Sequence, residues 1–274
     1  MDSMLSCIKD QLESTMAEYA AEDICLAFSG GVDSSLLLKI AVDAAKKTGK
    51  NVHAVTFDSR LHTACDLVIA SRVAAELGSI HHIIAIDELA QENIRQNPVN
   101  RCYLCKYSLF RTLRDFASRM GVSCVMDGTN EDDMHAYRPG IRALRELAII
   151  SPLAQLHIRK ADVKRLAECY GISVAARPST PCMATRLPYG TEIDYEILSR
   201  LADGEEYLRT ILSGNIRLRL HGQVVRIEVD EPVMVELLSK RAEVVACLKE
   251  LGFIYITMDI EGFRSGSMDI GMIL

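Results

Sequence analysis

The chain has 274 residues, enough for one large domain or two modest ones, and its 49% hydrophobic and 25% charged residues are typical of globular proteins. A net charge of −6 without a basic block argues against nucleic acid or another large polyanion as a partner. No apolar run reaches the roughly 18 residues needed to span a membrane. No basic-then-apolar signal pattern opens the chain, so we expect a cytoplasmic protein without a membrane partner.

Short apolar strands alternate with helices in the first half of the chain. Helical patterns cover residues 1–22, 34–49, 61–77 and 103–120, and strands are predicted at residues 24–28, 51–57, 80–86 and 122–126. This alternation predicts a parallel α/β sheet with right-handed crossovers. Because ligands of such sheets bind outside the carboxyl ends of the strands, we expect residues 29–34, 57–58 and 127–130 to share one ligand-binding edge.

A glycine-rich turn joins the first strand to the next helix and reads Ser29-Gly30-Gly31-Val32-Asp33-Ser34. Glycines let the backbone turn tightly and leave no Cβ to block a ligand. The first-turn amides of the helix are free to bind a phosphate group. The SGGxDS string resembles the PP-loop of the ATP pyrophosphatases, which implies cleavage of ATP between its α and β phosphates. Because a carboxylate repels phosphate, we expect Asp33 either to lie beside Mg²⁺ or to brace the loop.

Three later segments extend this edge. Asp127-Gly128-Thr129-Asn130 is either a simple turn or a nucleotide contact, and its place beside the predicted ATP site favours contact. Residues 133–140 are polar and end in Pro-Gly, so we expect a mobile lid. Ser151-Pro152-Leu153 followed by Lys160 and Val163 resembles the SPL…KxxV element of PP-loop enzymes.

The pattern changes after a helix over residues 160–170 and a proline-rich loop over residues 175–190. A small α+β unit follows, with helices over residues 194–212 and 233–251 and strands over residues 216–221, 224–229 and 253–260. We therefore divide the chain into a PP-loop domain over residues 1–190 and a C-terminal domain over residues 191–274.

Nine cysteines occur, and six of them lie in apolar patterns that indicate core positions: Cys7, Cys25, Cys65, Cys124, Cys169 and Cys247. Cys102 and Cys105 form a C-x-x-C, which alone fits a zinc ligand pair, a redox dithiol, two ligands of an iron–sulfur cluster, or two incidental cysteines. Cys182 lies beside a proline in an irregular segment, where nearby Arg186 would favour the thiolate. Three thiolates can hold a [4Fe–4S] cluster with one iron open to sulfide.

Six motifs together give a specific resemblance over nearly the whole chain: FSGGVDSSLLLK, DGTNEDD, YRPG, TRLPYGT after Cys182, IRLRLHG and FRSGSMD. They resemble the ATP-dependent sulfur transferases of the lactate racemase pathway, which build the nickel-pincer nucleotide cofactor. The resemblance implies that ATP and Mg²⁺ adenylate a carboxylate of a pyridinium-dicarboxylate mononucleotide, which becomes a thiocarboxylate. It also implies a symmetric homo-oligomer.

The family has two branches that differ in the origin of the sulfur. One sacrifices the sulfur of a single cysteine, which Cys182 matches. The other uses a three-cysteine [4Fe–4S] cluster as a renewable sulfur carrier. Because Cys102 and Cys105 are absent from the sacrificial branch, we favour the cluster, with the sacrificial route as the alternative.

The resemblance also implies roles for individual residues. Pyrophosphate-binding positions are Ser29, Gly30, Gly31, Asp33 and Ser34, and the predicted nucleotide contacts are Phe57, Asp127 and Thr129. Arg217 and Arg219 alternate on a strand, so both point to one face, where they would clamp the substrate phosphate. The alternative for this pair is a solvated strand face. Arg186 is expected to stabilise charge on the adenylate, and Glu205 and Glu236 match acidic positions nearby.

Three other functions fit parts of this pattern. A tRNA thiolation enzyme also combines a PP-loop with a three-cysteine cluster, but it predicts a basic face or an added RNA-binding domain. A non-catalytic nucleotide-binding module with structural zinc predicts ATP binding without pyrophosphate release. An amide synthetase would leave Cys102, Cys105 and Cys182 without a role.

Overall fold

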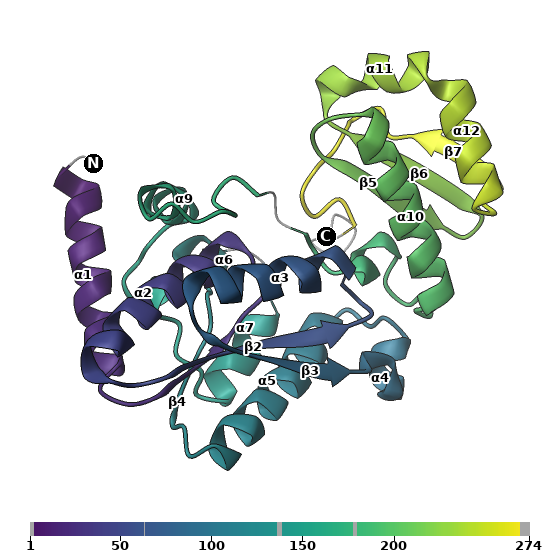
Figure 1. Cartoon of the computed structure of the whole chain (residues 1–274). Helices are drawn as coiled ribbons and strands as arrows, with labels where there is room; N and C mark the ends of the chain where they lie inside the picture. The colour runs from purple at the N-terminus through teal and green to yellow at the C-terminus, as the bar shows by residue number, and fades with distance from the viewer. Residues whose placement is uncertain (1–2, 63, 136–138, 178–179, 269–274) are drawn as a thin grey trace. The chain divides into compact units, whose positions relative to one another are not determined.

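The computed structural model describes residues 3–62, 64–135, 139–177 and 180–268. Its contacts divide the chain into two compact units (Figure 1). The N-terminal unit comprises Met1–Asp87 and Asn100–Thr180, and the C-terminal unit comprises Glu88–Val99 and Pro181–Leu274. The sequence predicts a single boundary after residue 190, whereas the contacts divide the chain after Thr180 and group residues 88–99 with the C-terminal unit.

A parallel sheet of four strands forms the centre of the N-terminal unit, in the order β3-β2-β1-β4. The strands are β1 (Ile24–Ala27), β2 (Val52–Ser59), β3 (Ile80–Ile86) and β4 (Cys124–Met126). Ile24 of β1 lies opposite Val52 of β2 and Cys124 of β4. Since the strands are parallel, their carboxyl ends meet at one edge. The predicted α/β fold is confirmed.

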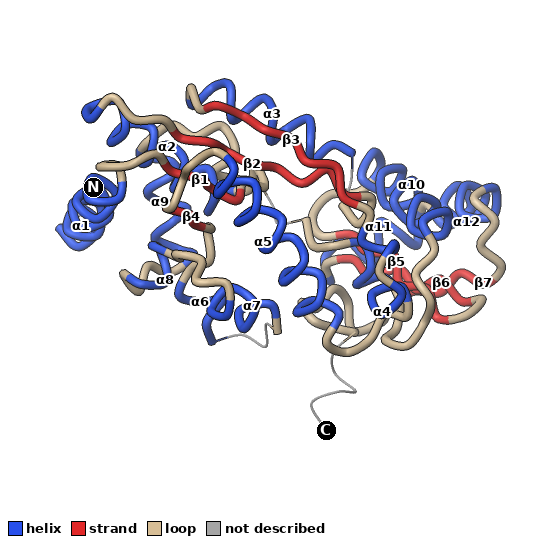
Figure 2. Tube along the Cα trace, turned by 90° about the horizontal axis from the view of Figure 1, so that it is seen from below, coloured by secondary structure: helices blue, strands red, loops and turns tan. Residues whose placement is uncertain are grey.

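Helices cover both faces of this sheet. The long ones are α1 (Ser3–Tyr19), α2 (Val32–Thr48), α3 (Ala64–Leu77), α5 (Arg101–Arg119) and α9 (Lys160–Cys169). Leu26 of β1 belongs to an apolar cluster with α1, α2, α3 and α9, whereas its neighbour Cys25 belongs to a second cluster with Phe110 and Leu113 of α5. Successive strand residues point to opposite faces, so α2 and α3 pack on one face and α5 on the other (Figure 2).

Three short helices follow β4: α6 (Glu131–His135), α7 (Gly140–Glu146) and α8 (Pro152–Gln155). Residues 133–135 end α6, and the Asp133 amide donates to the Asn130 side chain at 3.2 Å, which caps that helix. The expectation of a mobile lid over residues 133–140 stays a prediction. Residues 136–138 lie outside the described residues. None of the described helices is long and apolar enough to cross a membrane.

The C-terminal unit has a mixed sheet in the order β5-β6-β7. Its strands are β5 (Ile216–His221), β6 (Val224–Val229) and β7 (Tyr255–Met258); β5 and β6 are antiparallel, and β6 and β7 are parallel. Helix α10 (Tyr195–Ile211) begins at Asp194, whose carboxylate accepts hydrogen bonds from the amides of Glu196 and Ile197. The unit also contains α4 (Glu92–Arg95) and the short 3₁₀ turns η1 (Glu88–Ala90), η2 (Met183–Arg186) and η3 (Glu231–Val233).

The helix predicted over residues 233–251 is two helices, α11 (Met234–Ser239) and α12 (Arg241–Glu250). The Ser239 hydroxyl donates to the Glu236 carbonyl at 2.7 Å, in competition with the backbone. The Lys240 amide is shared between the carbonyls of Glu236 and Leu237, which tightens the last turn and ends α11.

The six cysteines predicted for the core divide into three groups by exposure. Cys25 and Cys124 are buried, which raises the pKa of Cys25 to about 12 and that of Cys124 to about 11. The prediction is wrong for Cys7, Cys65 and Cys169, which are exposed. Cys247 is half-buried. A residue of cysteine's size fits either side of an amphipathic helix, so its position in the pattern alone does not place it.

Candidate active site

The glycine-rich loop joins β1 to α2 and is closed by its own serines. The Gly31 amide donates to Ser29 Oγ at 3.3 Å, and the Ser34 hydroxyl donates to the Gly31 carbonyl at 3.1 Å. The two serine oxygens are 3.2 Å apart. Gly31 is the N-cap of α2, so the next amides have no intrahelical acceptor and suit an anion.

Close backbone contacts explain two of the glycines at this edge. Gly30 has a left-handed φ of +68°, and a Cβ there would lie 2.8 Å from the Ala70 Cα. A Cβ on Gly128 would lie 2.9 Å from the Ser34 amide nitrogen. The loop after β4 therefore packs directly on the first turn of α2.

Asp33 is held by two side chains from distant parts of the chain. Asn130 Nδ2 donates to Asp33 Oδ1 at 3.0 Å, and Lys160 Nζ pairs with Asp33 Oδ2. Asp33 therefore joins the loop to the segment after β4 and to the start of α9, and of its two expected roles this geometry fits bracing. No role was predicted for Lys160, although it is the lysine of the SPL…KxxV element.

Asp127 is buried at the end of β4 and organises the 127–130 loop. Its Oδ1 accepts hydrogen bonds from the Thr129 amide at 3.2 Å and from the Ser151 hydroxyl at 2.6 Å, and its Oδ2 accepts from the Thr129 hydroxyl at 2.6 Å. Lys106 Nζ of α5 lies 3.7 Å from Oδ2. Nucleotide contact by Asp127 and Thr129 stays a prediction. Lys106 was not predicted at this edge.

Phe57 is half-buried near the carboxyl end of β2, against the apolar cluster under α5. The hydroxyl of its neighbour Thr56 donates to the Phe28 carbonyl at 2.7 Å and so ties β2 to the last residue before the loop. The predicted loop and Asp127 thus follow β1 and β4, and Phe57 lies near the end of β2, which is next to β1.

Cys102 and Cys105 lie in the first turns of α5, three residues apart and therefore on one face. Both are half-buried. Arg101 Nη2 lies 3.6 Å from Cys102 Sγ. In the part of the chain that the structure describes, no three His, Cys, Asp or Glu side chains are grouped as a metal site.

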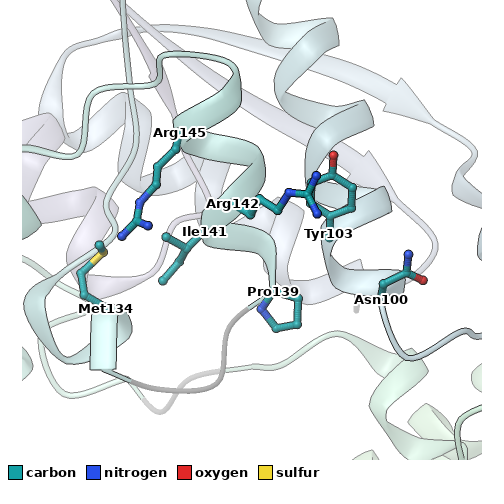
Figure 3. Close-up of a pocket in the computed structure, with 7 residues that line it drawn as sticks. All are labelled: Asn100, Tyr103, Met134, Pro139, Ile141, Arg142 and Arg145. Carbon is teal, nitrogen blue, oxygen red and sulfur yellow. The ribbon is translucent and has the colours of Figure 1, made fainter.

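A pocket of about 440 Å³ opens beside this turn of α5. Its lining residues are Asn100, Tyr103, Met134, Pro139, Ile141, Arg142 and Arg145 (Figure 3). The Arg142 guanidinium lies 4.8 Å from the centre of the Tyr103 ring, and the Tyr103 hydroxyl donates to Glu146 at 2.7 Å. Figure 3 shows Arg142 directed at Tyr103 and Arg145 directed toward Met134.

Cys182 is half-buried in the C-terminal unit, at the start of η2. Its carbonyl accepts from the Thr185 hydroxyl at 2.8 Å and from the Thr185 amide at 3.1 Å. Arg186 Nη1 donates to the Pro181 carbonyl at 3.2 Å and to Thr185 Oγ1 at 3.0 Å. Residues 181–186 therefore form a tight turn around the Arg186 guanidinium.

Arg186 is 1% exposed and forms a bidentate ion pair with Glu205 of α10, at 2.8 and 3.0 Å. Glu205 also accepts from the Leu218 amide at 3.0 Å and pairs with Arg209 at 2.7 Å. Burial alone would raise the pKa of Glu205, but the hydrogen bonds and charge of Arg186 outweigh it and hold the pKa below its ordinary value. The predicted action of Arg186 on the adenylate stays a prediction.

Arg217 and Arg219 lie two residues apart on β5, and both are buried, which rules out a solvated strand face. Arg219 donates to Glu228 at 3.1 Å and to the Thr185 carbonyl at 2.8 Å. Burial, with the charge of nearby Arg186, lowers the pKa of Arg217 to about 10. Arginines thus outnumber carboxylates around β5, which suits an anion. Glu236 is exposed on α11 and pairs with Lys240 at 2.8 Å.

Comparison with known proteins gives matches along the chain. The asparagine synthase family model matches residues 8–132, which include the glycine-rich loop and the parallel sheet. The chain is 36% identical to an uncharacterized protein of Synechocystis sp., with 96% of this chain and 98% of that protein covered. It is 34% identical to the pyridinium-3,5-bisthiocarboxylic acid mononucleotide synthase of Lactiplantibacillus plantarum, with 90% and 88% covered. An uncharacterized protein of Methanocaldococcus jannaschii is 30% identical, with 93% and 96% covered.

Proposed function

The chain belongs to the PP-loop ATP-dependent sulfur transferases, the family of the Lactiplantibacillus synthase, and on that premise we propose that it converts a carboxylate of a pyridinium-dicarboxylate mononucleotide into a thiocarboxylate. The observation that carries this proposal is the similarity to that synthase over 90% of the chain, because it spans both the loop and the C-terminal arginines. The product would serve the synthesis of the nickel-pincer nucleotide cofactor.

Activation of the carboxylate is assigned to the N-terminal unit. A carboxylate is a poor electrophile, whereas an acyl-adenylate carries AMP as a good leaving group. The amides at the start of α2 would hold the phosphates of ATP, with the backbone approach kept open by Gly30 and Gly31. Mg²⁺ would arrive with ATP and offset phosphate charge. We assign it no ligand, because Asp33 is engaged by Lys160 and Asn130.

Recognition of the substrate phosphate is assigned to β5. Arg217 and Arg219 share one face of β5. With Arg186, these arginines carry more positive charge than Glu205 and Glu228 carry negative charge. A buried excess of cations is costly in water-free surroundings unless an anion offsets it. A mononucleotide phosphate has the charge and the oxygen geometry for such arginines.

The sulfur chemistry is assigned to Cys102, Cys105 and Cys182. The two α5 cysteines fit a cluster, because they share a helix face and Arg101 lies beside one of them. The tight turn of residues 181–186 would fix the third thiolate. Together, Cys102, Cys105 and Cys182 would hold a [4Fe–4S] cluster, which would supply the sulfide for the transfer. A sulfur nucleophile then forms the C–S bond of the thiocarboxylate, and the C–O bond to AMP breaks.

The test is anaerobic incubation of the full-length protein with ATP, Mg²⁺, sulfide and the pyridinium-dicarboxylate mononucleotide. We expect AMP, pyrophosphate and a product in which sulfur replaces oxygen, identified by mass spectrometry. A protein that releases pyrophosphate only with tRNA, or that leaves the mononucleotide unchanged, would contradict the proposal.

A further inference from the structure

Lys106 follows Cys105 directly in α5, and its side chain extends to the edge of the sheet that carries the glycine-rich loop. Its Nζ lies 3.7 Å from Asp127 Oδ2 and 5.6 Å from the centre of the Phe110 ring. Asp127 follows β4, and the next residue, Gly128, packs on Ser34 in the first turn of α2. Lys106 therefore brings a positive charge from the cysteine-bearing helix to the nucleotide edge.

Gly140 leaves the room that this lysine side chain needs. An added Cβ at Gly140 would lie 2.7 Å from Lys106 Cδ and 3.4 Å from the Cys102 carbonyl oxygen. The start of α7 thus lies against the stem of Lys106, and any larger residue there would displace the stem. Packing, and not only flexibility, directs the ammonium to Asp127.

Asp127 does not depend on Lys106 for its hydrogen bonds. The hydroxyls of Thr129 and Ser151 and the Thr129 amide already donate to its carboxylate. A separation of 3.7 Å is longer than a hydrogen bond. Within the described ranges the Lys106 ammonium makes no hydrogen bond, so its three donors are available to another acceptor. The Lys106 side chain is 33% exposed and that of Asp127 is 7% exposed, so a ligand can reach the ammonium.

We propose that Lys106 is a nucleotide-binding residue whose ammonium contacts the α-phosphate of ATP, the phosphate that remains in AMP. The inference rests on the adenylation step of the proposed function. A phosphate is a stronger partner than a carboxylate already satisfied by three other donors. When the acyl-adenylate reacts, the same contact stabilises the negative charge that develops on the departing AMP.

The first test compares AMP with adenosine, which lacks the phosphate, by calorimetry on the full-length chain. We expect Lys106→Gln to weaken AMP binding about tenfold and to leave adenosine binding unchanged. Gly140→Ala keeps the lysine but displaces its stem, so we expect this variant also to bind AMP more weakly than the wild type. Thermal unfolding of each variant checks that the fold is retained.

A second readout follows the lysine itself. Acetylation of lysines, quantified by peptide mass spectrometry, is expected to slow at Lys106 when AMP is added and to stay unchanged at exposed Lys50. The assignment would be overturned if both variants bound AMP as tightly as the wild type and if bound AMP did not slow acetylation of Lys106. A wild type that binds neither AMP nor ATP would instead refute the adenylation step, and the role of Lys106 with it.

Discussion

Arg186 is a buried cation whose guanidinium nitrogens all bond within the C-terminal unit. Nε and Nη2 bind Glu205, and Nη1 binds the Pro181 carbonyl and Thr185 Oγ1. A side chain engaged in this way stabilises the turn that carries Cys182. This contact explains why an arginine is needed four residues after the cysteine more directly than charge alone does.

Glu205→Gln tests this buried ion pair. The change removes the counter-charge of Arg186 while keeping the size of the side chain, and we expect the free energy of unfolding to fall by about 3 kcal/mol. Glu236→Gln is the matched control, because Glu236 pairs with Lys240 on the surface and should cost less than about 1 kcal/mol. Urea unfolding measures both, and equal losses would contradict the account.

At the scale of elements, the turn from β1 to α2 needs glycine at position 30, because a side chain there would collide with α3. Gly30 and Gly49 both have left-handed φ, at +68° and +70°, but only a Cβ on Gly30 would meet backbone atoms of another element. Comparing substitutions at Gly30 and Gly49 therefore separates the cost of backbone strain from the cost of steric conflict with α3.

We expect Gly49→Ala to cost about 1 kcal/mol from backbone strain alone, and Gly30→Ala to cost about 3 kcal/mol because Ala70 must also move. Only Gly30→Ala should abolish ATP binding, measured by calorimetry. Loss of ATP binding in both variants, or in neither, would show that close packing of the loop on α3 is unimportant.

Elements set by local pattern were predicted well from the sequence. The bounds of β3, β5 and β6 are as predicted, because apolar residues at strand spacing between turn residues determine them. The break between α11 and α12 was missed, since it depends on one serine hydroxyl that competes with the helix backbone.

Contacts between residues far apart in the chain could not be predicted from the sequence. Lys160 pairs with Asp33 across 127 positions, and no local pattern indicates that pairing. Residues 88–99 belong to the C-terminal unit because the Asn97 side chain bonds the Pro188 carbonyl and the Ile193 amide bonds the Arg95 carbonyl. The loop motif predicted the ATP edge, but the positions of Lys106 and Lys160 at that edge required the fold.

For the whole molecule, histidines whose pKa is lowered by the fold make stability depend on pH. Burial lowers the pKa of His53, and the adjacent His82, at 3.0 Å, lowers it further. Partial burial also lowers the pKa of His81. These groups bind fewer protons in the folded state than in the unfolded chain, so the stability they give is present above pH 6.5 and is lost as the pH falls.

We therefore expect the free energy of unfolding to decrease from about pH 7.5 to about pH 5.5. His53→Gln should flatten this dependence, whereas the same change at exposed His62 should leave it unaltered. Urea unfolding at several pH values measures both slopes. A stability that rises as the pH falls would contradict the assignment.

We propose that Cys102, Cys105 and Cys182 all serve sulfur transfer. The most direct test of this proposal is the iron and acid-labile sulfide content of the anaerobically purified full-length protein, with the Cys102→Ser, Cys182→Ser and Cys247→Ser variants alongside. We predict about four irons per chain in the wild type and in Cys247→Ser, and loss of iron in the other two. A wild type that stays free of iron after reconstitution, yet transfers one sulfur with loss of the Cys182 thiol, would contradict the account.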